Sequence, residues 1–449
     1  MNSFAIAIVI YAIAGTAIAL FARKFGFRSD EDYYIAGRNV SGFVSAMTYA
    51  ATTYSAFMMV GLVGLSYATG VGAYGFEMFY LAGTLMLLSY YAPKIWKMSR
   101  ELNAVSPAEL IGKRFGERTA LAIALISLLA LIPYTSSQLI GVSLVMEKLS
   151  GIDFYTAIVI SAVLIALWAF IGGLRGVAWT DAVQGVIMLS AALLAVIYIY
   201  LLNPGFAGEV SKLGELMQVP NRIWTPQLFI KLTVPWFFFA LTNPQVFQRL
   251  FIPKDEKALK RMVVYFGLFG LLYTVMVTLI GLMLRVMAEG GAFPMIRDRD
   301  LVTPTMLSLM PSWLSLLVGI SILAAAITTA NSIILSLSSM VSRDITKSQM
   351  AGRAAIVVLT LAVAIFASMR PAYIVELAVM SSTLLLSALP LVIALVHTKF
   401  ERGFEAVVGG FAVGLALSYI KYPFTGVAVL VVGFAVLLAS NLTKREKEV

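Results

Sequence analysis

Oxygen-bearing side chains crowd one short stretch of an apolar segment. Residues 324–332 read Ala-Ala-Ala-Ile-Thr-Thr-Ala-Asn-Ser, so Thr328 and Thr329 are adjacent. Residues three apart share a helix face, which places the carbonyl of Ala325 and the hydroxyl of Thr328 on the same side. Hard cations take oxygen ligands, and this cluster would suit sodium. The alternative is that the hydroxyls bond carbonyls four residues earlier in their own helix.

A second run of small and hydroxyl residues lies near the N-terminus. Residues 45–55 read Ser-Ala-Met-Thr-Tyr-Ala-Ala-Thr-Thr-Tyr-Ser. Such a run predicts a helix that is broken inside the membrane, which is tolerated only around a cavity. We take Thr53 and Ser55, beside the expected break, as candidate substrate-binding residues. An ordinary packing face of small residues is the alternative.

Pro244 marks a second expected break. Proline removes a backbone donor and clashes with the preceding turn, so it kinks or ends a helix. Asn243 and Gln245 flank it and are candidate substrate-binding residues. For Gln248 and Arg249 the alternative is a helix that ends at the cytoplasmic surface, capped by Arg249.

Glu77 is the acidic residue that stands out within an apolar segment, a few residues after its start. A charge at that depth is costly and usually faces a cavity or a partner. We expect Glu77 to bind the substrate. The alternatives are a carboxyl that bonds a neighbouring helix, or a helix that starts later.

A glycine pair joins two apolar segments. Gly172 and Gly173 predict a tight turn. Thr180 or Asp181 is expected to cap the helix that follows.

These residues must be positioned by membrane helices. Apolar residues make up 60% of the 449-residue chain and charged residues only 12%, where a soluble domain has about 25% charged residues. A span needs about 20 residues. On that measure the sequence predicts an all-α membrane protein with about thirteen transmembrane helices, over 2–22, 41–68, 72–98, 119–147, 153–172, 177–202, 226–250, 258–287, 312–343, 351–369, 371–397, 403–420 and 422–441.

The distribution of basic residues sets the expected orientation. With the N-terminus outside, 24 of the 33 Lys and Arg residues fall on inner connections and nine on outer ones. Cytoplasmic loops carry such an excess. We therefore expect a multi-pass protein of the cell membrane with its C-terminus in the cytoplasm. The net charge of +10 is then a matter of topology, and nucleic acid is not an expected partner.

The composition also excludes two kinds of chemical site. The chain has no cysteine and one histidine, His397, so thiolate chemistry and multi-histidine metal sites are excluded. We therefore do not expect an enzyme, and we expect no cofactor other than a bound sodium ion.

Motifs along residues 30–345 carry a family resemblance. They are the Asp-Tyr-Tyr-Ile-Ala-Gly-Arg stretch at 32–38, Gly172-Gly173-Leu with Trp179-Thr-Asp181 and Gln184, Gln248-Arg249, and Thr328-Thr329-Ala-Asn-Ser332 with Arg343-Asp344. On these the chain resembles the sodium/solute symporter family, which includes sodium/proline and sodium/galactose transporters.

The resemblance implies one transporter domain over 1–449 with a leucine-transporter-type core of two inverted five-helix repeats. The repeats would span 41–202 and 226–397. Residues 1–40, with an extra first helix and loop, and 403–441, with two extra helices, would be additions.

The resemblance also implies a sodium site between the broken second span and the ninth. Its ligands would be the backbone carbonyls of Ala51, Tyr54 and Ala325 and the hydroxyls of Thr328 and Thr329. Glu77 aligns with a glutamate that contacts sugar in galactose-type members, and Asn243 with an asparagine of that pocket. Proline-type members often have Asp where this chain has Thr53, so the resemblance leaves the solute open.

The expected function is sodium-coupled symport of a small polar organic solute by alternating access. An amino acid such as proline, a sugar and a carboxylate all fit. A proton-coupled or uncoupled carrier is the alternative, with Glu77 carrying the proton. A solute sensor built on a transporter fold is a further one.

Overall fold

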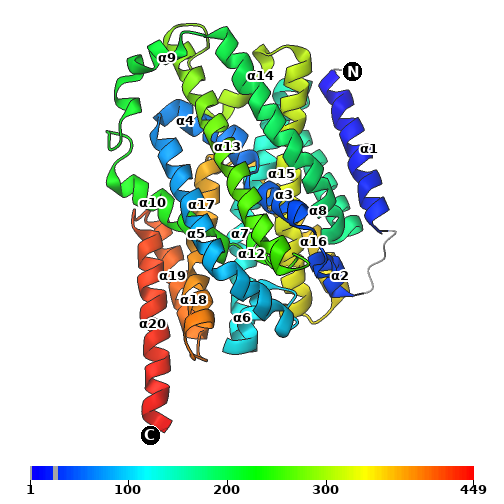
Figure 1. Ribbon diagram of the computed structural model, residues 1–449, viewed down its shortest axis with the longest axis vertical. Helices are drawn as coiled ribbons and strands as arrows, with labels where there is room; N and C mark the ends of the chain where they lie inside the picture. Colours follow the sequence, from blue (N-terminus) through cyan, green and yellow to red (C-terminus); the bar gives the residue numbers. More distant parts are fainter. Residues whose placement is uncertain (1–2, 24–28, 449) are drawn as a thin grey trace.

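The computed structural model describes residues 3–23 and 29–448, which fold into a bundle of helices (Figure 1). Two residues counted on the predicted inner side, Lys24 and Arg28, lie outside the described residues. Within the described ranges no β-strand forms, and one isolated bridge pairs Val40 with Pro253. The prediction of an all-α protein is confirmed.

The first half of the chain forms the helices α1 (Ser3–Arg23), α2 (Asp30–Ile35), η1 (Ala36–Arg38), α3 (Gly42–Thr53), η2 (Phe57–Leu62), α4 (Val63–Thr69), α5 (Gly72–Glu101), α6 (Pro107–Phe115), α7 (Glu117–Ser150), α8 (Phe154–Leu202), α9 (Phe206–Glu209) and η3 (Val210–Met217). The second half forms α10 (Pro226–Phe237), α11 (Phe239–Thr242), α12 (Pro244–Arg249), α13 (Glu256–Glu289), η4 (Arg299–Leu301), α14 (Val302–Leu309), α15 (Ser312–Met340), η5 (Val341–Ile345), α16 (Gln349–Met369), α17 (Ile374–Leu385), η6 (Leu386–Ala388), α18 (Leu389–His397), α19 (Phe404–Tyr419) and α20 (Thr425–Glu448).

The helix lengths agree with the predicted spans. In the described part of the chain, eight helices are long and apolar enough to cross a membrane, or nine if the bent pair α3 and η2–α4 is one span. The 49 residues of α8 are too many for one span, and the helix changes direction at Gly173, where φ is 50°. Counting α8 as two spans and adding α5, α10–α12 and α19 gives the thirteen that the sequence predicts.

Polar residues at helix starts set several of the boundaries. Ser41, Asp153, Thr225 and Asp255 each accept a hydrogen bond from the backbone N–H three residues later, at the starts of α3, α8, α10 and α13. These residue types are favoured there because they satisfy an N–H group that lacks a partner within the helix.

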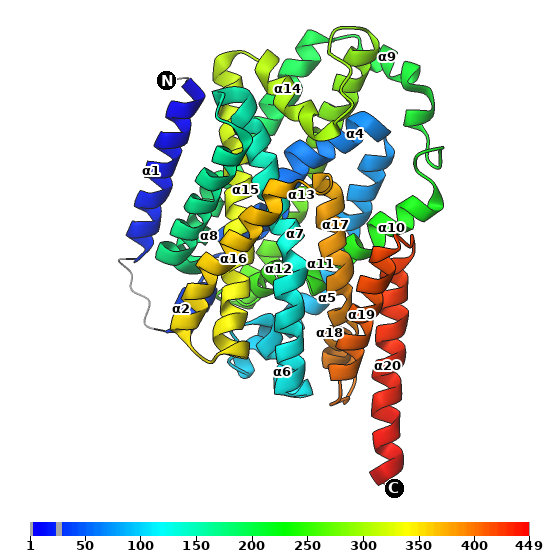
Figure 2. The same ribbon diagram turned by 180° about the vertical axis from the view of Figure 1, so that it is seen from behind.

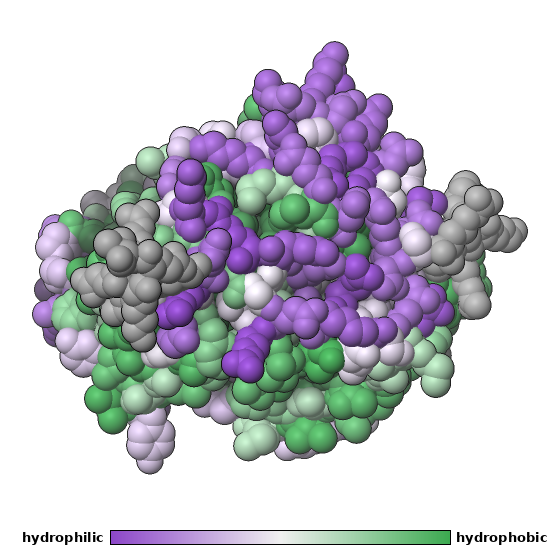
Figure 3. Space-filling model, turned by 90° about the horizontal axis from the view of Figure 1, so that it is seen from below, coloured by the Kyte–Doolittle hydropathy of each residue, from purple (hydrophilic) through white to green (hydrophobic). Residues whose placement is uncertain are grey.

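The additions predicted at the two ends of the chain stand at opposite edges of the bundle. Helix α1 packs on α8 at one edge, and α19 and α20 pack together at the other (Figures 1 and 2). Between them, α15 contacts α8, α7 and α3, and α17 packs on α7. The end that holds α6 and α12 is the predicted cytoplasmic end, and Figure 3 shows a band of hydrophilic residues across it.

At the predicted outer end, the segment between α13 and α15 covers the bundle. Asp300 in η4 is buried, and its carboxylate accepts a hydrogen bond of 3.1 Å from the N–H of Ile374, the first residue of α17. Burial raises the pKa of this carboxyl to about 6. Asp300 therefore binds the start of α17, but keeping this buried carboxyl ionised costs free energy.

The stability of the Asp300→Asn variant should fall less with rising pH than the stability of the unmodified protein. The pKa in the folded protein is above the ordinary value of about 3.9, so the contribution of Asp300 to stability is largest at low pH and is lost as pH rises through about 6. The shift of about two units corresponds to at most roughly 3 kcal/mol. Apparent melting temperatures in detergent, measured from pH 5 to 7.5, should show an advantage of the variant that grows with pH.

Asp298→Asn is the matched control in the same loop, since it removes an ion pair of 2.7 Å with Arg370. It should lower stability without the growing advantage. An Asp300→Asn variant with the same pH profile as the unmodified protein would contradict the assignment.

Candidate functional site

The predicted break in the second span is present. Helix α3 ends at Thr53, and α3 and the η2–α4 pair differ in direction by 49°. The break releases the N–H of Ala56 from helical bonding, and the side-chain oxygen of Gln138 on α7 accepts it at 3.1 Å. Phe57–Leu62 then forms a π-helical turn, a form of helix frequent at functional sites.

Helix α15 faces this break with the predicted oxygen cluster. The hydroxyl of Thr329 donates a hydrogen bond of 2.8 Å to the carbonyl of Ala51 on α3. A hydroxyl can turn its hydrogen away and offer a lone pair instead. Two oxygens from different helices can therefore face one cation. Ala325, one turn earlier on α15, and Tyr54 are both buried.

Thr328 contacts a residue whose burial the sequence interpretation missed. Its hydroxyl donates to one carboxylate oxygen of Asp181, and the hydroxyl of Thr48 on α3 donates to the other. Asp181 is fully buried within α8. The prediction that Thr180 or Asp181 caps a helix is wrong, because the helix resumes directly after Gly173 and Thr180 bonds carbonyls of its own helix.

Arg249 is also buried, so its interpretation as a surface cap is wrong. Its Nε donates to the hydroxyl of Thr48 at 3.2 Å, and its Nη2 donates to the hydroxyl of Ser332 at 2.5 Å. Thr48 thus joins Arg249 to Asp181 by accepting from one and donating to the other. A buried charge is tolerated when it is compensated and hydrogen-bonded. This series of hydrogen bonds runs from Arg249 through Thr48 and Asp181 and ends at Thr328 of the predicted cation site.

The predicted break at Pro244 is present as well. Asn243 is extended between α11 and α12, and Pro244 is the first residue of α12. The side-chain N–H of Asn243 donates to Thr242 at 3.2 Å, and its oxygen accepts from Ser382 on α17 at 3.5 Å. Gln245 is buried, and both polar atoms of its amide lack a hydrogen-bond partner among the described residues.

Glu77 lies in the first two turns of α5, beneath a group of aromatic rings. Phe76 packs against Trp236, with ring centroids 6.2 Å apart, and Tyr80 lies 5.9 Å from the same indole. Oε2 of Glu77 and the indole nitrogen of Trp236 are both buried and form no hydrogen bond of ordinary geometry with a described residue, although the indole lies within hydrogen-bonding reach of the carboxylate. Buried polar groups without partners are rare and call for an ion, water or ligand.

The remaining candidates divide into two kinds. Ser55 is used locally, since its hydroxyl accepts from the N–H of Phe57 at 3.2 Å. Thr53 is buried at the end of α3, and its hydroxyl is unpartnered in the part of the chain that the structure describes. No hydrogen bond between described residues joins Glu77 to Asn243 or Gln245. Among the sodium candidates the structure thus joins Thr329 directly to Ala51, while the hydroxyl of Thr328 bonds Asp181, and no direct bonds link the substrate candidates.

All ten predicted site residues are buried, and the outer segment contacts the broken helix above them. The hydroxyl of Thr303 on α14 donates to the carbonyl of Met59 in the π-helical turn. Gly64 on α4 lies against the carbonyl of Arg299, where an added Cβ would come within 2.1 Å. The outer segment therefore rests on the backbone of the broken helix.

The predicted cytoplasmic end is closed by polar contacts. The side-chain N–H of Gln248 donates to the carbonyl of Val105 at 2.8 Å and to the hydroxyl of Ser339 at 3.1 Å. Nearby, Arg343 forms an ion pair of 2.8 Å with Glu109. Contacts between helices thus cover the buried site at both ends.

Solved structures share this overall fold. A Na⁺-coupled sialic acid symporter, solved in a substrate-bound outward-open state, matches with a TM-score of 0.82 at 20% identity over 97% of this chain and 98% of that one. Mhp1 in an inward-facing conformation matches with a TM-score of 0.55 at 14% identity over 96% of this chain and 91% of that one. The fold is that of a multi-pass membrane transporter of the leucine-transporter type, as predicted.

The sequence places the chain within that class. The model of the sodium:solute symporter family matches residues 33–401, and the chain belongs to that family. Sodium/pantothenate symporters of Haemophilus influenzae and Escherichia coli are 28% and 27% identical to it over 312 and 267 residues. These matches cover 67% and 57% of this chain but only 63% and 55% of the two relatives.

Thr48→Val tests the chain of contacts behind Thr328. The substitution keeps the shape and removes the hydroxyl, so Asp181 loses one donor and Nε of Arg249 loses its acceptor. Leaving buried charged groups short of a partner costs roughly 1–3 kcal/mol. The apparent melting temperature in detergent should fall, and Thr48→Ser should restore it.

Thr278→Val is the matched control, because the buried hydroxyl of Thr278 bonds only carbonyls of its own helix. Equal losses of stability in Thr48→Val and Thr278→Val would show that Thr48 carries no special role.

Proposed function

We propose that the chain is a sodium-coupled symporter of a small polar organic solute. The observation that carries the proposal is the contact between Thr329 on α15 and the carbonyl of Ala51 at the break after α3. A cation bound there would hold the two helices together through the carbonyls of Ala51, Tyr54 and Ala325 and the hydroxyls of the threonine pair. Family membership and the shared fold support this reading of the oxygen cluster.

The two broken spans fit a chain with an internal repeat. One break follows α3, in the first span of the proposed repeat 41–202, and the other precedes α12, in the first span of 226–397. Inverted repeats with discontinuous helices at matching positions are typical of secondary transporters. Alternating access would then be a rocking of one helix group against the other. The excess of basic residues supports an outside N-terminus.

The solute would lie beside Glu77 and the aromatic rings around Trp236. The carboxylate of Glu77 accepts hydrogen bonds, the indole donates one, and the amide of Gln245 does both. This set suits a solute with hydroxyl or amide groups. The named solutes of the compared proteins, pantothenate and sialic acid, both carry a carboxylate, hydroxyls and an amide. Pantothenate is therefore the first solute to test, with proline, galactose and sialic acid beside it.

Thr328→Ala/Thr329→Ala tests the coupling ion. Uptake of the panel into proteoliposomes is measured under an inward sodium gradient, under a proton gradient and with neither. A hydrogen bond or ligand contact to a charged group contributes about 1.5–3 kcal/mol, so the sodium concentration for half-maximal uptake should rise at least roughly 10- to 100-fold.

Thr360→Ala is the control, since the buried Thr360 only bonds a carbonyl of its own helix, α16. It should leave the sodium dependence unchanged. Uptake by the unmodified protein that ignores sodium and follows a proton gradient would overturn the sodium proposal.

Glu77→Gln tests the solute pocket. The substitution keeps the size of the side chain and removes its charge. If Glu77 binds solute, the KM for solute should rise roughly 10- to 100-fold while the sodium dependence stays the same. Glu147→Gln, which changes an exposed carboxylate near the end of α7, is the control.

Glu77→Gln also distinguishes sodium coupling from the alternative, a proton-coupled carrier. A protein in which Glu77 carries a coupling proton would lose gradient-driven uptake in Glu77→Gln but keep solute exchange between the two sides. That result would replace sodium coupling with proton coupling at Glu77.

A further inference from the structure

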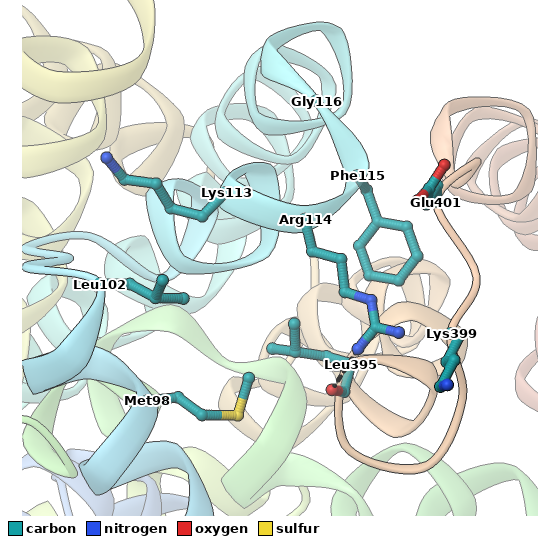
Figure 4. Close-up of a pocket in the computed structure, with 9 residues that line it drawn as sticks. All are labelled: Met98, Leu102, Lys113, Arg114, Phe115, Gly116, Leu395, Lys399 and Glu401. Atoms are coloured by element: carbon teal, nitrogen blue, oxygen red, sulfur yellow. Dashed lines mark hydrogen bonds between the residues drawn. The ribbon is translucent and has the colours of Figure 1, made fainter.

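A basic hollow opens at the predicted cytoplasmic end, away from the proposed transport site. It has a volume of about 680 Å³ and lies between α5, α6, α18 and the loop before α19 (Figure 4). We call it the phosphate basin; its lining is Met98, Leu102, Lys113, Arg114, Phe115, Gly116, Leu395, Lys399 and Glu401. Three of its side chains are cationic and one is acidic.

Arg114 builds the basin and adds to its charge. Its guanidinium donates to the carbonyl of Leu395 at 2.9 Å, near the end of α18 (Figure 4). It also donates to the carbonyls of Phe400, at 3.0 Å, and Thr398 in the loop that follows. These partners are neutral, so they fix the side chain without cancelling its charge. An arginine never loses its proton in a protein.

The lysines of the basin face outward. Lys113 is 4.0 Å from Glu109, a carboxylate that Arg343 already pairs at 2.8 Å, and its side chain is 46% exposed. Lys399 is exposed on the loop. The basin therefore presents positive charge to a ligand from the aqueous side.

An apolar hollow adjoins the basin on the membrane side. It has a volume of about 310 Å³ between α7 and α19. We call it the acyl groove; its lining is Arg118, Leu121, Ala122, Leu125, Ile126, Leu129, Phe404, Val408 and Phe411. Apart from Arg118 at its mouth, all of these residues are apolar, and Leu129 is 61% exposed.

One packing contact lies between the two hollows. The ring of Phe115 lies against Gly403, where an added Cβ would come within 3.0 Å. Gly116 of the basin is two residues from Arg118 of the groove, and Glu401 is three from Phe404. From Arg118 to Leu129 the groove follows α7 for about 16 Å, which is close to half of the roughly 30 Å hydrocarbon thickness.

We propose that the phosphate basin and the acyl groove together bind one anionic phospholipid of the cytoplasmic leaflet. The phosphate would meet Arg114 and Lys399, with Lys113 adding its charge from the opposite side of the basin (Figure 4), and one acyl chain would lie between α7 and α19. Charge complementarity favours an anionic lipid, because basic pockets between helices on this side attract such headgroups. The bound lipid would fasten α19, and α20 packed on it, to the bundle, since the contact of α19 with α7 runs along this groove.

The test uses the full chain in a neutral detergent, with phosphatidylglycerol as the probe and phosphatidylcholine as the uncharged comparison. Native mass spectrometry counts retained lipid, and thermal unfolding reports stabilisation. We expect one retained phosphatidylglycerol and a rise in apparent melting temperature that phosphatidylcholine does not give. Ligands that bind only the folded state raise stability with their concentration.

The basin variant is Lys113→Gln/Arg118→Gln/Lys399→Gln, which spares the structural Arg114. At about 1 kcal/mol per cation near an anionic headgroup, the three changes should weaken binding about 100-fold. The matched control, Lys257→Gln/Lys260→Gln/Arg261→Gln, removes the same charge from exposed residues at the start of α13 and should bind like the unmodified protein.

Leu125→Trp tests the groove separately, because it fills the hollow and leaves every basin charge in place. It should reduce retention of phosphatidylglycerol as well. Equal loss in the basin and control variants would show nonspecific charge attraction and overturn the proposal. So would retention that Leu125→Trp leaves unchanged, or an equal stabilisation by glycerol phosphate, since a soluble phosphate ligand needs no acyl groove.

Discussion

The hydrocarbon core of a membrane offers no hydrogen-bond partner, so a helix can be broken there only if the protein itself satisfies the freed backbone. The break after α3 meets this constraint at Ala56, whose N–H is bound by the side chain of Gln138. The carbonyl of Ala51 receives the hydroxyl of Thr329 from α15. The same geometry that makes the break tolerable places backbone oxygens in the interior, and such oxygens are what a sodium ion requires.

The interior also holds opposite charges without a direct ion pair. Arg249 and Asp181 are both buried and are connected through the hydroxyl of Thr48. Because a hydroxyl can both accept and donate, it joins the two charges while leaving each in its own place. One end of this chain is Thr328, so the charge balance of the core depends on the same residue that we propose as a sodium ligand.

Local patterns predicted the breaks, but not the partners that satisfy them. Pro244 and the run of small residues before Tyr54 each predict a helix break at their own position, and both breaks are present. Gln138 is a single amide in a long apolar helix, and nothing beside it indicates that it meets the N–H of Ala56, 82 residues away. Asp181 follows a glycine pair that is typical of a capped turn. Its burial is decided by Thr48 and Thr328, 133 and 147 residues away.

The contact between Gly64 and the carbonyl of Arg299 makes the outer segment a mechanical part of the broken helix. With no space for even a methyl group between them, α4 cannot tilt toward the segment around η4 unless that segment lifts. The position of that segment therefore reports the conformational state of the buried site. Since the chain has no cysteine, two introduced thiols, one on this segment and one on a fixed helix, would carry spectroscopic labels without background, and the distance between them would follow each opening and closing.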